Sequence, residues 1–283
     1  MDELELDLPA EPSERERTVA DRFRRRVVMN VPDRDNEKLA RLIDAVNRDD
    51  ELYALWVASN VNAMERLGMT DHGPVHVKIV MNIAAKLLRL LVDRGVQPAV
   101  VQNYGLGVDD AAVVVTLAAL LHDVGMSIHR ADHESYSLFI AQDRIRHLLS
   151  GLYDVATATI IRSEALHAII AHRSGGAPLT VEAGVVRVAD ALDMAKGRSR
   201  IPFEAGSASI HSVSAQAIED VRIEAGEEKA IRLSITMSNS AGLFQLDQLF
   251  REKLRGSGLE PYVELEAHIE GETEKRLLKT YRI

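Results

Sequence analysis

The most apolar segment of the chain covers residues 109–122 and ends on the pair His122-Asp123. After two acidic residues in its first turn, nearly every position up to Leu121 is apolar, so a helix here has no polar face to turn towards water. Such a helix must be buried on all sides. The segment is shorter than the roughly 18 to 20 residues that a membrane span requires. We therefore expect a central core helix surrounded by other helices, and no transmembrane segment.

Composition restricts the chemistry that such a core can support. The chain has 283 residues, enough for about two domains, and it contains no cysteine. Disulfides, thiolate metal ligands and a cysteine nucleophile are therefore excluded, and any metal must be bound by histidine and carboxylate side chains. The formal net charge of −9 disfavours a long nucleic-acid duplex as a partner. The N-terminal sequence lacks the pattern of a signal peptide, so we expect a cytoplasmic protein.

Helical spacing of apolar residues recurs on both sides of the core helix. Between the predicted helices, glycine and proline mark the breaks, for example at Gly151, Gly175 and Pro178. We expect residues 1–34 to form an acidic and arginine-rich arm, and residues 35–200 to form an all-helical domain. Besides the core helix, the spacing predicts helices at residues 36–46, 52–67, 76–92, 132–149, 154–172 and 179–194.

The pattern changes after Pro202, where apolar and polar residues alternate. We expect residues 201–283 to form a small α+β domain of order β-β-α-β-β, with a short helix at 214–218 before it. Unpaired strand edges are natural sites of association, so we expect a homo-oligomer. The amphipathic helix of this domain is compatible with a dimer interface, a regulatory ligand module or an ordinary packing layer. The expected strands are residues 221–223, 231–235, 263–269 and 277–283, with the helix at 240–254.

Ionisable residues recur inside the apolar helices. His122 and Asp123 end the core helix, His76 lies on the apolar face of residues 76–92, and Asp190 lies within the apolar helix at 179–194. Burying such groups costs on the order of several kcal/mol unless a partner compensates. A metal ion bound by all four is the simplest compensation, whereas the His-Asp pair alone is also compatible with a satisfied pair without metal. Nitrogen and oxygen donors suit Mn, Fe, Co, Ni, Zn or Mg.

The order of these residues, His, then His-Asp, then Asp, resembles the H…HD…D motif of the HD superfamily of metal-dependent phosphohydrolases. HVKIV supplies the first histidine, LLHDVGM the dyad with its trailing glycine, and VADALD the last aspartate. The resemblance covers about residues 70–198. It implies a mainly α fold, in which an HD-type helical bundle precedes the α+β domain. It also implies that a metal-activated water hydrolyses a phosphoester of a nucleotide or a related small phosphorylated molecule.

Some members of that superfamily bind two metal ions through extra histidines between the dyad and the last aspartate. His133 and His172 are the candidates here, so the resemblance implies one or two divalent ions per chain, with Asp123 bridging two. Asp123 and His133 are the expected catalytic residues, since His133, or Glu134 beside it, can protonate the leaving group if it is not a ligand. Cations beside the ligands are expected to bind the substrate phosphate, namely Arg130, Arg173, Lys196 and Arg198.

Two other functions remain open at this point. One is a non-catalytic regulatory module that binds a nucleotide or a partner protein and uses the metal structurally. The other is a di-iron oxygenase on the same bundle, because the extra histidines can support such a centre. A lysine that often follows the dyad in the branch that cleaves cyclic di-GMP is Met126 here, and no Gly-Tyr-Pro tripeptide follows His172, which argues against cyclic di-GMP as the substrate. Asp193 is expected to orient a ligand or Arg198 rather than to bind metal.

Overall fold

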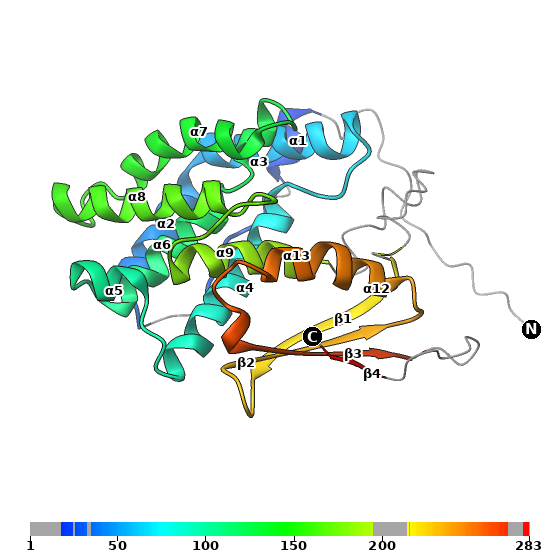
Figure 1. The fold of residues 1–283 in the computed structure, drawn as a ribbon. Helices are drawn as coiled ribbons and strands as arrows, with labels where there is room; N and C mark the ends of the chain where they lie inside the picture. Colours follow the sequence, from blue (N-terminus) through cyan, green and yellow to red (C-terminus); the bar gives the residue numbers. More distant parts are fainter. Residues whose placement is uncertain are drawn as a thin grey trace, which may run out of the picture.

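The computed structural model describes residues 18–24, 26–32, 35–194, 214, 216–270 and 280–282. Its first part is helical, and its second part is a small sheet with a helical segment between the sheet and the bundle (Figure 1). The helical part consists of α1 (Val19–Arg24), α2 (Glu37–Arg48), α3 (Asp50–Asn60), its π-helical continuation η2 (Val61–Arg66), α4 (Pro74–Asp93), α5 (Ala99–Tyr104), α6 (Val108–Leu121), the 3-10 turn η3 (Val124–Ser127), α7 (His133–Leu148), α8 (Val155–Ala171) and α9 (Val181–Leu192).

Helix α6 is the centre of the bundle. Every residue from Val113 to Leu121 is buried, and the helix contacts α2, α4, α8 and α9. By length and composition alone the stretch Val108–Ser127 is apolar enough to cross a membrane, but 89% of its most apolar window is buried inside the fold. That burial is typical of the core helix of a soluble protein. The prediction of a buried central helix is therefore confirmed.

The predicted helices are present, and polar side chains define where several of them begin. Asn36, Asp49 and Thr180 each accept a hydrogen bond from a backbone N–H in the first turn of the helix that follows them. Helix α5 was not predicted, because its six residues are too few to show a helical period. The buried carboxylate of Glu182, from α9, accepts hydrogen bonds from the first two N–H groups of α5, at 3.0 and 2.9 Å.

The second part has the predicted order β-β-α-β-β. Strand β1 (Ile218–Ala225) pairs antiparallel with β2 (Ile231–Met237), β2 pairs parallel with β3 (Val263–Ile269), and β3 pairs antiparallel with β4 (Thr280–Arg282). Parallel neighbours require a crossover, which is supplied by α12 (Gly242–Phe244), η4 (Gln245–Phe250), α13 (Arg251–Leu254) and the turn η5 (Glu260–Tyr262). The prediction of a short helix at 214–218 is wrong at its C-terminal end, because Ile218 is the first residue of β1.

The helical segment α12–η4–α13 brings the second part of the chain against the bundle (Figure 1). Helix α9 contacts both η4 and α13, and α4 contacts β1 and β2. The approach is close, since a side chain at Gly184 of α9 would overlap the carbonyl oxygen of Ser257. The domain boundary predicted near residue 200 falls within 195–213, outside the residues described here.

Candidate metal centre

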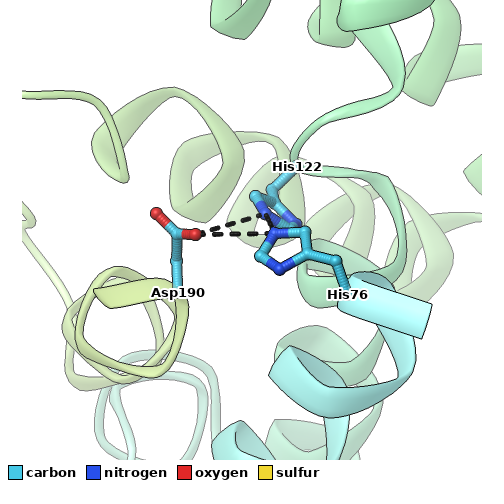
Figure 2. Close-up of side chains that lie close together, drawn as sticks. All are labelled: His76, His122 and Asp190. Atoms are coloured by element: carbon cyan, nitrogen blue, oxygen red, sulfur yellow. Dashed lines mark hydrogen bonds and ion pairs between the residues drawn. The ribbon is translucent and has the colours of Figure 1, made fainter. Parts of the chain in front are cut away.

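Three helices bring histidine and aspartate side chains to one point. His76 lies in the first turn of α4, His122 directly follows α6, and Asp190 lies near the end of α9. Figure 2 shows these three side chains converging. The Nε2 atoms of His76 and His122 are 3.2 Å apart, and the Asp190 Oδ1 atom lies 3.6 and 3.8 Å from them. Nitrogen and oxygen donors at this spacing fit a divalent metal ion.

Asp123 connects this group to a second pair of histidines. Its Oδ2 atom lies 3.4 Å from His76 Nε2 and 3.3 Å from His122 Nε2. Its Oδ1 atom lies 3.1 Å from His133 Nε2 and 3.6 Å from His172 Nε2. The structure thus brings together all of the side chains that the sequence singled out as metal ligands. The two oxygens of Asp123 face two different histidine pairs.

The histidine rings are oriented by their Nδ1 atoms. His122 Nδ1 lies 2.8 Å from the carbonyl oxygen of Ala119, and His172 Nδ1 lies 2.6 Å from that of Ile169. Because a carbonyl oxygen only accepts hydrogen bonds, each Nδ1 carries a proton and Nε2 offers its lone pair to the centre. His76 Nδ1 lies 2.6 Å from the Asp193 carboxylate. Asp193 therefore orients a candidate ligand, as expected.

This arrangement requires positive charge at its middle. The Nε2 lone pairs of His76 and His122 point towards one another in a site where both side chains are fully buried, so either a proton or a metal ion must lie between them. Burial opposes the charged form of His122, but the negative charges of Asp123 and Asp190 outweigh it and raise the pKa of His122 to about 10. A metal ion can replace that proton. The donor set therefore fits divalent metal binding.

The two carboxylates stay ionised in this buried site. Burial alone would raise the pKa of Asp123, but the charge of His122 holds that pKa well below its usual range. Burial acts in the same direction on Asp190, and the charge of Lys253 holds the pKa of Asp190 well below its usual range. The site thus keeps two negative carboxylates that attract a cation.

A further acidic group lies beside the second histidine pair. The Oε2 atom of Glu134 is 3.2 Å from His133 Nδ1, and His133, Glu134 and His172 place donor atoms close enough to hold one ion. From the sequence, Glu134 was expected only to take part in proton transfer. The guanidinium of Arg130 lies 2.9 Å from His133 Nδ1, so this expected substrate cation lies next to the centre.

The other expected substrate cations differ in their placement. Arg173 directly follows His172 and is exposed, whereas Lys196 and Arg198 lie outside the described residues. Lys253, which the sequence did not single out, places its Nζ atom 3.4 Å from Asp190 Oδ2. It is 63 residues from Asp190 in the chain, so no local pattern connects the two.

Serine side chains fix the backbone of the dyad. Ser137 of α7 donates to the carbonyl oxygen of His122 at 2.7 Å, and its oxygen accepts from the N–H of Gly125 at 2.8 Å. Ser59 of α3 donates to the carbonyl oxygen of Asp123 at 3.3 Å. Sequence reasoning missed both serines, because an isolated serine in a helix carries no distinctive signal. They hold the turn in which α6 ends and Asp123 points into the centre.

Gly125 allows α7 to approach this turn, and replacing it with alanine is expected to destabilise the protein. A Cβ atom there would overlap the carbonyl oxygen of His133 and the N–H of Ser137, which are both backbone atoms. We expect Gly125→Ala to lower the free energy of unfolding by about 3 kcal/mol, measured by urea denaturation. Gly107→Ala is the control, since its Cβ would meet Asp110 Oδ2 at 3.5 Å, an ordinary contact. Equal stability of the two variants would contradict this role of Gly125.

Comparison with known proteins agrees with the geometry. The sequence profile of the HD domain matches residues 75–195, which contain all of the candidate ligands. Uncharacterized protein MJ1020 of Methanocaldococcus jannaschii is 41% identical over 231 residues, which cover 82% of this chain and 89% of that protein. The histidines and aspartates that come together from α4, α6 and α9 lie within the matched region, and the chain belongs to the HD domain family.

Proposed function

We propose that this protein is a metal-dependent phosphohydrolase that cleaves a phosphoester of a nucleotide or a related small phosphorylated molecule. The observation that carries the proposal is the convergence of His76, His122, Asp123 and Asp190 on one buried point, with imidazole lone pairs and carboxylate oxygens facing each other. Metal-dependent phosphohydrolysis is the activity generally found in the HD family. A small substrate is in keeping with the net charge of −9.

The residues of the centre divide into groups with different tasks. When bound, a divalent cation lowers the pKa of a water molecule towards about 7 and neutralises charge on phosphoryl oxygens. His76, His122 and Asp190 would hold such an ion, and Asp123 would share it. Asp123 also faces His133 and His172 through its other oxygen, which supports a second ion there. We propose two ions per chain, with Asp123 between them.

Charged groups around the second pair would act on the substrate. Arg130 lies beside His133, where its guanidinium can bind phosphoryl oxygens in a bidentate manner. Like Arg130, Glu134 lies beside Nδ1 of His133. It can hold a proton for the leaving group. The centre thus offers cations for the phosphate and an acid for the departing alcohol.

Metal removal tests the proposal. Protein stripped with a chelator should hydrolyse none of a panel of nucleoside monophosphates, cyclic nucleotides and short oligonucleotides. Turnover of at least one of them should return on addition of Mn²⁺, Fe²⁺, Co²⁺, Ni²⁺, Zn²⁺ or Mg²⁺. Turnover that survives chelation would contradict the proposal. Metal-loaded protein that turns over no compound of the panel would also contradict it and would favour the regulatory alternative.

A further inference from the structure

We propose that Lys253, which comes from the C-terminal helical segment, is a positioning residue of the metal centre. It holds the side chain of Asp190 so that a single carboxylate oxygen faces the histidines. The inference deepens the proposed function and rests on it. It also makes the second part of the chain a contributor to the centre rather than a separate packing layer.

The two oxygens of Asp190 have different surroundings. Oδ1 faces His76 Nε2 and His122 Nε2, at 3.6 and 3.8 Å. Oδ2 faces the Lys253 ammonium at 3.4 Å. Both side chains are largely buried, with 17% of Asp190 and 20% of Lys253 exposed, so water screens this ion pair less than a surface pair. An ammonium on the outer oxygen keeps the carboxylate from rotating, which orients the inner oxygen as a ligand.

Lys253 also contacts the other half of the centre. Its ammonium donates a hydrogen bond to the backbone carbonyl oxygen of His172. The imidazole of that same residue faces Asp123 through Nε2. One ammonium group therefore connects a carboxylate on α9 with the residue that directly follows α8. The two helices that supply ligands to different sides of Asp123 are held by the same lysine.

A buried arginine fixes the backbone from which Lys253 extends. Arg187 is 2% exposed and precedes Asp190 by three residues on α9. Its Nε atom donates to the carbonyl oxygen of Lys253 at 2.8 Å, and Nη2 donates to that of Glu252 at 3.3 Å. Its Nη1 atom donates to the carbonyl oxygens on either side of His172, those of Ala171 at 3.3 Å and of Arg173 at 2.5 Å.

The arginine therefore holds α13 and the end of α8 in a fixed relation. Lysine side chains ordinarily lose much conformational freedom when they are held in one place. Here a rigid guanidinium holds the backbone of Lys253 itself and the backbone on either side of its partner His172, so only the lysine side chain must be ordered. This geometry is typical of a lysine that positions another side chain, and not of a mobile lysine on the surface.

The test uses the full-length protein loaded with Co²⁺, whose visible absorption depends on the number and geometry of its ligands. In Lys253→Met the carboxylate of Asp190 is released and can rotate or offer both oxygens. We expect the Co²⁺ absorption bands to shift and kcat for the best phosphoester to fall by at least about tenfold. KM should change by less than about threefold, because the lysine acts through Asp190 rather than on the substrate.

Lys229→Met is the matched control. Lys229 lies in the same part of the chain, is partly buried and donates to two carbonyl oxygens, those of Glu260 at 3.0 Å and Val263 at 2.8 Å. Its described contacts include no candidate ligand. We expect its Co²⁺ absorption and kcat to match those of the wild type. If Lys253→Met does not fold, as judged by circular dichroism, Lys253→Gln takes its place with the same expected results.

The outcomes separate this inference from the function on which it rests. An unchanged Co²⁺ spectrum and unchanged kcat in the Lys253 variant would overturn the positioning role. An unchanged spectrum with a raised KM would overturn it as well and would place the lysine on the substrate. Wild-type protein that binds no Co²⁺ would overturn both the inference and the proposed metal centre. If the wild type turns over substrate and the Lys253 substitution changes neither the spectrum nor kcat, only the inference is overturned and the proposed function stands.

Discussion

Replacing Asp123 with asparagine is expected to reduce kcat for phosphoester hydrolysis by about a thousandfold or more, which corresponds to ~4 kcal/mol of lost transition-state stabilisation. Asparagine has nearly the same shape, so the fold should persist. The negative charge between the two histidine pairs is lost, however, and an amide nitrogen replaces one of the oxygens that face them. The measurement is kcat at saturating Mn²⁺, with metal content determined on the same samples.

The control for this substitution is Asp143→Asn. Asp143 is an exposed carboxylate on α7 that pairs with Arg146 at 3.3 Å, so the same chemical change is made on the surface of a helix that belongs to the site. We expect its kcat to stay within twofold of the wild type, as surface substitutions usually do little. An Asp123→Asn variant that retains more than a tenth of wild-type turnover would be incompatible with Asp123 as the central residue of the site.

Replacing Arg187 with methionine is expected to lower the free energy of unfolding by about 4 kcal/mol. The guanidinium supplies hydrogen bonds to four buried or partly buried carbonyl oxygens, and methionine can supply none. Each carbonyl that loses its partner inside the protein costs roughly 1 to 3 kcal/mol. The carbonyls belong to α13 and to the chain around His172, so their release also loosens the metal centre. Urea denaturation at neutral pH measures the effect.

Two further arginine variants calibrate this result. Arg187→Lys keeps the charge but loses the fork of donors, and it should fall between wild type and Arg187→Met. Arg146→Met removes a 60% exposed arginine with one ion pair, and it should cost less than about 0.5 kcal/mol. If the free energy of unfolding of Arg187→Met lies within about 1 kcal/mol of the wild-type value, the guanidinium does not hold α13 and the chain around His172 together.

The helices and the first group of ligands were predictable because they follow from simple patterns. The period of apolar residues located α4, α7, α8 and α9, a continuous apolar run located α6, and alternation located the strands. His76, His122, Asp123 and Asp190 stood out because each is an ionisable residue within an apolar helix or at its end. Burial of such groups demands a shared partner, and the structure places all four together.

Other parts of the site depend on contacts that no local pattern reveals. Lys253 and Arg187 act between segments far apart in the chain. In the sequence, a single largely buried lysine on an amphipathic helix looks the same as a lysine on the solvent-exposed face. Arg187 did carry a signal, since it lies in the same apolar helix as Asp190 and its burial also requires partners. Those partners are backbone carbonyls, and a sequence pattern does not identify them.

The sheet shows the same division between local and distant information. Alternation of residues predicted the strands, but it does not reveal that β2 pairs parallel with β3 or that the crossover α12–η4–α13 between them packs on α9. That packing also brings α13 to the metal centre. The arrangement of the second part relative to the bundle is therefore what completes the site.

The most direct test of the metal centre is X-ray diffraction from crystals of the full-length protein loaded with Mn²⁺, recorded where manganese scatters anomalously. We predict one anomalous peak bounded by His76, His122, Asp123 and Asp190. A second peak is predicted on the other side of Asp123, beside His133 and His172. A single peak at the first position would contradict the second ion and would support a centre with one metal ion. Manganese that binds elsewhere, with no peak among these residues, would contradict the account.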